Sequence, residues 1–371
     1  MKSISQLTIK LSGNDISDNE AKLFFQFFKG FKKLTHLNID LSYCNIGLEG
    51  VQCLAESLSQ INQLSSIDIN LRGNDLGNKG TNLLALGLKK MVSLNSLALN
   101  LSENDIESES VFHLSSNIKE LSFLTSFKID LKNNPIKEEG LSELTNCLKK
   151  MNKLTQLQIL LKCNGIESTG ASNFAGSLKE LTLIESLNID LKDNDINSQG
   201  AYHLGIALQN QFFTSLNINL QYCNIGQQGV KYIIEAVSQM NTLSSLDINL
   251  SGNDLGDQDV NYLTSQLNKM NFLTSLAINL GDTGIGVESC KNIANALKNF
   301  NQIECLNLEL RSNDIGQEGA KFLANALVEM YQLRVLEINF LENNIEYQGA
   351  KNLADALNEL QLLEQLNQPN N

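Results

Sequence analysis

The chain repeats one pattern about every thirty residues, and this constrains the fold more than any other feature of the sequence. The pattern reads L-x-x-L-x-I-x-L-x-x-N-x-I, as in residues 34–46, where Cys44 takes the place of the asparagine, and an apolar stretch follows it. Twelve copies begin at Ile4, Leu34, Leu64, Leu94, Leu124, Leu154, Ile184, Phe213, Leu243, Leu273, Ile303 and Leu333, and a truncated thirteenth begins at Leu363. Such a chain folds by stacking its units, because one unit alone cannot bury its apolar face.

The two halves of a repeat have different periods. We number positions from the first apolar residue of each copy. Positions 4, 6 and 8 are apolar in every copy, as in Leu246, Ile248 and Leu250, and this alternation predicts a strand with one buried face. Positions 21, 25 and 28 are also apolar, with the spacing of Leu54 and Leu58, which predicts one face of a helix. Each repeat is therefore predicted to be a strand, a turn and a helix.

This pattern resembles the leucine-rich repeat family, and within it the ribonuclease-inhibitor-like class. That class reads L-x-x-L-x-L-x-x-N/C-x-L, then a glycine, then a helix with leucines four apart; the present strand has one additional x-L pair. The resemblance implies an α/β leucine-rich-repeat solenoid, a horseshoe with a parallel β-sheet on the concave face and helices on the convex face. We expect a single domain of about twelve repeats over residues 1–366, and a polar C-terminal tail over residues 367–371.

Position 11 is asparagine in most copies, and Cys44, Cys223 and Thr283 replace it in three. A buried amide at this point bonds the backbone of its own turn and of the neighbouring one, so we expect a structural ladder along the stack.

Composition excludes several classes of function. The net charge of −13 argues against nucleic acid and anionic membranes as partners. There are only three histidines and no Cys-x-x-Cys pair, so we predict no catalytic residue, no cofactor and no metal site. Single carboxylates at position 12, one repeat apart, do not form a calcium loop. Seven cysteines, an odd number, are typical of free thiols in a reducing compartment, and we predict a cytoplasmic location.

Side chains at positions 5 and 7 alternate with the buried ones and therefore point out of the sheet, and position 9 adds cations beside them. The candidate protein-binding residues are Asp40, Asp68, Asn70, Arg72, Asn100, Asp130, Lys132, Asp190, Lys192, Asn219, Asp247, Asn249, Asn279, Glu309, Arg311 and Glu337. Two interpretations stay open: a solvated sheet whose side chains bond along the stack, or a polar, charge-balanced groove for a protein. We expect Lys132 to meet Asp130. Tyr43 and Tyr222 either anchor a partner or pack on a turn.

The first helical region is rich in phenylalanine. Phe24, Phe28 and Phe31 fit the buried positions 21, 25 and 28, whereas Phe25 and Phe27 do not. The second pair gives the hypothesis that one end of the solenoid docks on another chain through these two rings.

The predicted function is a non-enzymatic protein-protein interaction scaffold, a subunit or adaptor of a larger intracellular assembly. About one residue in eight is asparagine, which is typical of an AT-rich genome such as a ciliate's and points to a cytoskeletal or axonemal complex in a cilium. The resemblance leaves two alternatives. One is a GTPase-activating protein of the Ran type, although those proteins typically end in a long acidic tail. The other is an inhibitor of a basic ribonuclease.

Overall fold

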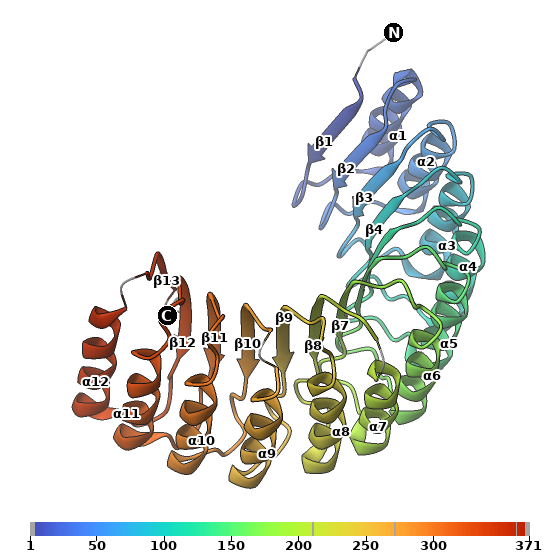
Figure 1. The fold of residues 1–371 in the computed structure, drawn as a ribbon. Coiled ribbons are helices and arrows are strands. Elements are labelled where there is room, and N and C mark those ends of the chain that lie inside the picture. Colours follow the sequence, from blue (N-terminus) through green and yellow to red (C-terminus); the bar gives the residue numbers. More distant parts are fainter. Residues whose placement is uncertain (1–3, 210, 271, 361, 368–371) are drawn as a thin grey trace. The chain divides into compact units, whose positions relative to one another are not determined.

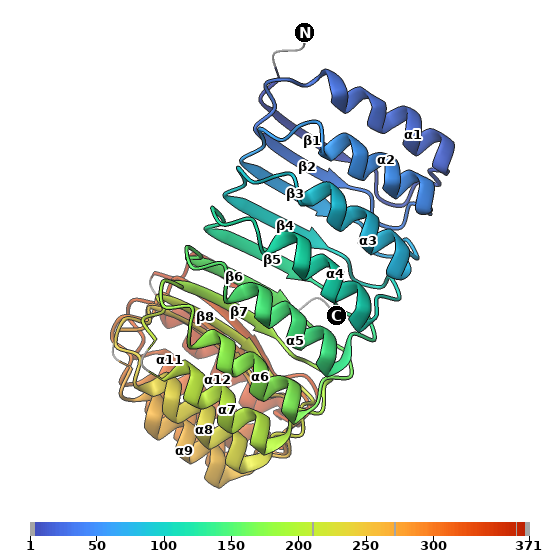
Figure 2. The same cartoon turned by 90° about the vertical axis from the view of Figure 1, so that its right-hand side faces the viewer.

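The computed structural model describes residues 4–209, 211–270, 272–360 and 362–367. The chain divides into two compact units, residues 1–190 and residues 191–371, and each is described by itself. In both units strands and helices alternate along the chain, as the repeat pattern predicts (Figures 1 and 2).

The first unit contains seven strands and six α-helices among its described residues. The strands are β1 (Gln6–Lys10), β2 (His36–Asp40), β3 (Ser66–Asn70), β4 (Ser96–Asn100), β5 (Ser126–Asp130), β6 (Gln156–Leu160) and β7 (Ser186–Asp190). The helices are α1 (Asp18–Gln26), α2 (Leu48–Leu58), α3 (Gly77–Leu88), α4 (Ser108–Ile118), α5 (Lys137–Leu148) and α6 (Ser168–Leu178). Each strand pairs in parallel with the next, and residues at the same repeat position face each other, as Ile39 faces Ile69.

The second unit is built in the same way. Its strands are β8 (Ser215–Asn219), β9 (Ser245–Asn249), β10 (Ser275–Asn279), β11 (Cys305–Glu309), β12 (Val335–Asn339) and β13 (Gln365–Asn367). Its helices are α7 (Asn197–Leu208), α8 (Gly226–Ser238), α9 (Asp257–Leu267), α10 (Val287–Leu297), α11 (Gly316–Leu327) and α12 (Glu346–Glu359). Strands β8 to β13 pair in parallel in chain order, and β13 is the predicted truncated copy. The polar tail was expected over residues 367–371; Asn367 belongs to β13 instead, and residues 368–371 lie outside the described residues.

The core of each unit lies between the sheet and the layer of helices that covers one of its faces (Figure 1). Between the first and the last copies the side chains at positions 4, 6 and 8 are buried, as Leu246, Ile248 and Leu250 illustrate with exposures of at most 1%. The apolar helix positions meet them from the other side, with Leu54 and Leu58 each 1% exposed. The opposite face of the sheet carries no helix, and it is the surface on which the candidate residues lie.

The asparagine ladder at position 11 is present. Asn104 is fully buried, and its Oδ1 accepts the backbone N–H groups of Asn74 and Leu76 in the preceding repeat, at 3.0 and 3.3 Å. Its Nδ2 donates to the carbonyls of Leu71 and Ser102 at 3.0 and 2.9 Å. Where cysteine replaces asparagine, the side chain keeps a hydrogen-bond donor but has no amide oxygen to accept. The Cys44 thiol donates to a carbonyl of the preceding repeat at 3.0 Å. The turns are therefore tied to one another by side chains.

The first helix differs from the prediction. Phe25, expected off the buried face, is fully buried, while Phe24 is half-exposed. Helix α1 ends at Gln26 and the chain continues as a 3₁₀ helix over Phe27–Gly30, whose three residues per turn shift the apolar face. Phe25, Phe28 and Phe31, three residues apart, then form the core, with successive ring centroids 6.0 Å apart. Phe25 is thus a core residue, and of the proposed docking pair only Phe27, 68% exposed, is on the surface.

Candidate interaction surface

The open sheet face, defined as the strand side chains at positions 3, 5 and 7 opposite the helices, is polar in both units. The alternation is clear in β2, where Leu37 and Ile39 are buried and Asn38 and Asp40 are half-buried. Most of the sixteen candidate residues are half-buried or exposed; Asp130 and Asp190, with exposures of 9% and 8%, are the two buried ones. The predicted face therefore exists.

Position 7 has a structural role that the sequence did not reveal. Its side-chain oxygen accepts the backbone N–H of position 9 in the same repeat, at 3.1 Å for Asn70 to Arg72 and 2.9 Å for Asn279 to Gly281. The same contact recurs at Asp40, Asn100, Asp130, Asn219, Asn249, Glu309 and Asn339. A side-chain oxygen, from Asn or Asp in every case except Glu309, thus ends each of these strands by closing a local turn. The bonds run within a repeat, and the Asn339 amide nitrogen also donates to Glu309 of the preceding repeat at 2.9 Å.

Side chains at position 5 form hydrogen bonds between neighbouring repeats. Asn217 Nδ2 donates to Asp247 Oδ2 at 2.6 Å, and the same asparagine-to-acid bond links Asn38 to Asp68 at 3.3 Å. Burial raises the pKa of Asp68 and the pKa of Asp247, because the half-buried face disfavours the charged carboxylate. Part of the open sheet face therefore matches the first interpretation, in which polar side chains bond to one another.

Replacing Asp247 with asparagine is expected to stabilise the protein at pH 7. The carboxyl has a higher pKa in the folded than in the unfolded chain, so its ionised form costs stability at neutral pH and that cost disappears as the pH falls through the raised value. Asp247→Asn should raise the free energy of unfolding at pH 7 by less than about 1 kcal/mol, and the gain should shrink as the pH falls through the raised pKa of Asp247. Urea unfolding at pH 7 and at a pH below the ordinary pKa of aspartate measures this. Asp314→Asn, on an exposed turn, is the control; an equal effect there would contradict the prediction.

Lys132 does not pair with Asp130 as expected. Its ammonium lies 3.2 Å from Asp190 Oδ2, two repeats further along, whereas Asp130 accepts the Lys132 backbone N–H. The long lysine side chain reaches across the intervening strand because Asp130 is already engaged by its own turn. Burial raises the pKa of the Asp130 carboxyl.

Two tyrosines at position 10 each span three repeats. Tyr43 donates through its hydroxyl to Glu103 at 2.7 Å, and Tyr222 donates to Asp282 at 2.8 Å. Each ring lies over a glycine of the intervening repeat. A Cβ at Gly252, whose φ is +68°, would lie 2.1 Å from the Tyr222 ring. The bond to the carboxylate raises the pKa of both tyrosines. The tyrosines therefore pack on turns, as one of the two interpretations held.

The two tyrosines belong to a longer duplication within the chain. Residues 43–47 and 222–226 both read Y-C-N-I-G, and residues 73–77 and 252–256 both read G-N-D-L-G, with an offset of 179 residues in each case. The offset corresponds to six repeats. Consequently Tyr43, Arg72, Glu103 and Lys132 of the first unit are equivalent to Tyr222, Ser251, Asp282 and Arg311 of the second.

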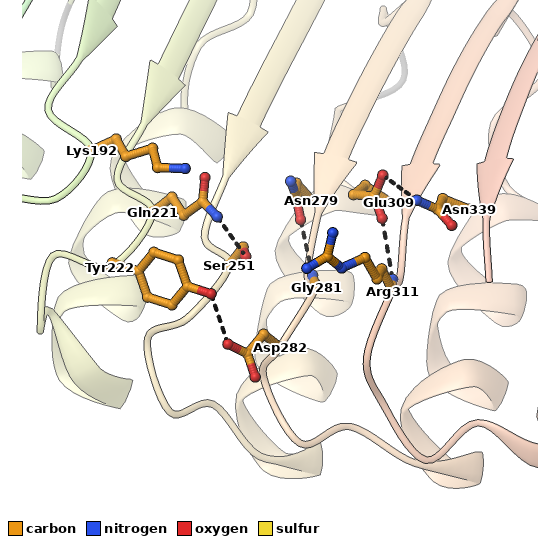
Figure 3. Close-up of a pocket in the computed structure, with 10 residues that line it drawn as sticks. All are labelled: Lys192, Gln221, Tyr222, Ser251, Asn279, Gly281, Asp282, Glu309, Arg311 and Asn339. Atoms are coloured by element: carbon orange, nitrogen blue, oxygen red, sulfur yellow. Dashed lines mark hydrogen bonds between the residues drawn. The ribbon is translucent and has the colours of Figure 1, made fainter. Parts of the chain in front are cut away.

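A pocket of about 350 Å³ opens on the second unit, at the carboxyl ends of its strands (Figure 3). Its floor is formed by the small position-9 residues Ser251 and Gly281, and Lys192 and Arg311 reach over it from opposite sides. The other lining residues are Gln221, Tyr222, Asn279, Asp282, Glu309 and Asn339.

The sequence named Lys192, Asn279, Glu309 and Arg311 as candidate binding residues, but it did not predict that they line one pocket. The signal that could have predicted the pocket is at position 9. Two consecutive copies have the small residues Ser251 and Gly281 there, and the copies on either side have larger residues, so a hollow is left between them. The first unit shows the counterpart: Arg72 occupies the place of Ser251, and its guanidinium lies 2.6 Å from Glu103.

Comparison with known proteins agrees with this architecture. The family model described as "Leucine Rich repeat" matches residues 33–55 and 305–324. Together with about thirty-residue units of parallel strand and helix, these matches fit a leucine-rich repeat protein. A chain in the crystal structure of the Rad7 and Elc1 complex in yeast is similar, with 15% identity, a TM-score of 0.48, and coverage of 88% of this chain and 89% of that one. No curated protein sequence matches the chain.

The described residues lack two further kinds of feature. None of their helices combines the length and apolar character needed to cross a membrane. Nor do they contain a group of three or more His, Cys, Asp or Glu residues arranged to hold a metal ion.

Proposed function

We propose that this protein is a non-enzymatic scaffold that binds another protein on its open sheet face. The observation that carries the proposal is the contrast between the two faces of each sheet. One is sealed by helices, and the other presents polar side chains at regular intervals and, in the second unit, a pocket at the strand ends. A wide surface of this kind gains affinity by adding many modest contacts.

Site-specific photo-crosslinking tests which face is used. A photoreactive amino acid at Asp68, exposed on β3, is expected to crosslink a partner when the protein is purified from its source. The same amino acid at Glu139, exposed on α5, is the matched control, because the two positions carry the same charge and differ in face. Partner crosslinks from Glu139 but not from Asp68 would contradict the proposal.

The finer assignment is a subunit or adaptor of a larger intracellular complex, of the cytoskeletal or axonemal kind that the composition suggests. The same preparation distinguishes the two alternatives. Acceleration of GTP hydrolysis by Ran would favour a GTPase-activating protein, and stoichiometric loss of ribonuclease activity on titration would favour an inhibitor.

A further inference from the structure

Side-chain oxygens that line the pocket of the second unit accept hydrogen bonds from neighbouring residues. Asp282 Oδ2 accepts the Tyr222 hydroxyl, and Glu309 accepts both the Arg311 backbone N–H at 3.2 Å and Asn339 Nδ2 at 2.9 Å. Asn279 Oδ1 is occupied by the Gly281 N–H, which leaves its amide nitrogen on the pocket side. The acidic groups are therefore largely engaged by the protein itself.

Among the described residues, Arg311 is the arginine without a carboxylate beside it. Of the three arginines in the chain, Arg72 lies beside Glu103, and Arg334 beside Glu304 and Glu364. For Arg311 no carboxylate lies within 4.0 Å in the part of the chain that the structure describes. Its guanidinium makes one long bond to the Ser312 hydroxyl, at 3.4 Å. It nevertheless faces the hollow above Ser251 and Gly281 (Figure 3).

The first unit shows what the equivalent cations bind. Arg72, in the place of Ser251, bonds Glu103 Oε1 at 2.6 Å, and Lys132, in the place of Arg311, bonds Asp190 Oδ2 at 3.2 Å. In the sequence, the position equivalent to Asp190 is Pro369, which has no carboxylate. The second unit thus keeps the cation but lacks its acidic partner, and the smaller Ser251 opens the space beside it.

We propose that this pocket binds a carboxylate of a peptide segment, with the Arg311 guanidinium as the main contact. A guanidinium presents two parallel N–H donors that match the two oxygens of a carboxylate. Asn279 Nδ2 on the pocket wall and the Ser251 hydroxyl on the pocket floor are additional hydrogen-bond donors. Lys192 contributes positive charge from the far side of the pocket. The inference rests on the proposed function in one respect, namely that the carboxylate belongs to a protein partner.

Nuclear magnetic resonance of ¹⁵N-arginine-labelled protein tests the inference directly, because three arginines give three Nε–H signals that single substitutions assign. The probe is an N-acetylated, C-amidated pentapeptide with a central glutamate among glycines. We expect a saturable shift of the Arg311 signal and no shift for Arg72 or Arg334. The same peptide with glutamine should leave all three signals in place. Pentaglycine with a free C-terminus shows whether a chain end also serves as the source of the carboxylate.

Two variants test the contributions of the Arg311 guanidinium and of the space above Ser251. Arg311→Gln and Ser251→Arg, which copies the first unit, should each weaken binding of the glutamate peptide at least tenfold, measured on backbone amide signals near the pocket that also report folding. Arg334→Gln, at a residue that pairs with Glu304 and Glu364 and does not line the pocket, should leave it unchanged. An unmoved Arg311 signal, an equal response to the glutamine peptide, or a steeper response to inorganic phosphate would overturn the proposal. None of these would affect crosslinking from Asp68, so the proposed function is tested separately.

Discussion

Asn104→Ala is expected to lower the free energy of unfolding by about 3–5 kcal/mol. The fully buried Asn104 amide makes four hydrogen bonds, and its loss leaves the N–H groups of Asn74 and Leu76 buried without their acceptor. Each such unsatisfied group costs roughly 1–3 kcal/mol, which is why the expected effect is large. Urea unfolding followed by circular dichroism measures the change. Hydrogen exchange of the Asn74 and Leu76 amides should accelerate more than exchange elsewhere.

The chain supplies its own control for this experiment. Cysteine occupies the ladder position naturally at Cys44, where the thiol donates to the carbonyl of Leu11. Asn104→Cys keeps a donor of that kind, although it loses the acceptor, and we therefore expect it to cost less than Asn104→Ala. An alanine variant that unfolds at the same urea concentration as the native protein would show that the ladder contributes little to stability.

Gly87→Ala and Gly176→Ala are expected to change stability in opposite directions. Gly87 lies in α3 where it touches α2, and a Cβ there would lie 2.7 Å from the Ala55 Cα and 2.8 Å from the Ala55 carbonyl oxygen. Backbone atoms cannot move aside as a flexible side chain can, so the helices must separate, at a cost of about 1–3 kcal/mol. Gly176 in α6 has no atom within 4 Å of the added Cβ. Alanine there should stabilise the helix by about 0.5–1 kcal/mol.

The two variants are matched because the chemical change and the type of element are the same. Thermal unfolding of both proteins in one buffer measures the difference. If Gly87→Ala were as stable as Gly176→Ala, close contact between α2 and α3 would not be what requires glycine at residue 87.

The sequence predicted the repeating strand and helix because each rests on a local rule. Leu246, Ile248 and Leu250 alternate, so they share one face of a strand wherever the repeat lies in the stack. The asparagine ladder was predictable for the same reason, since one residue serves the same turn in every copy. Phe25 shows where a local rule fails: the change from α-helix to 3₁₀ helix after Gln26 moves the buried face, and nothing in the spacing of the phenylalanines marks that point.

The candidate site was less predictable because it depends on contacts between repeats. Lys132 reaches Asp190, and Tyr222 reaches Asp282, in each case across a whole intervening repeat. A pattern read within one unit does not contain such distances. Predicting the pocket requires the side-chain sizes of several copies at once. Ser251 and Gly281 are small in neighbouring copies, whereas Lys192 and Arg311 have long side chains.

The tyrosines that span three repeats also limit how this gene can change length. Tandem repeats commonly gain or lose a unit by unequal recombination. If the copy containing Gly73 were deleted, the Tyr43 ring would meet a side chain at Glu103, where glycine is needed, and its hydroxyl would face Asn133 in place of a carboxylate. Loss of that one copy would therefore remove the contacts that Tyr43 makes across residues 34–123, and the same holds for Tyr222 across residues 213–302.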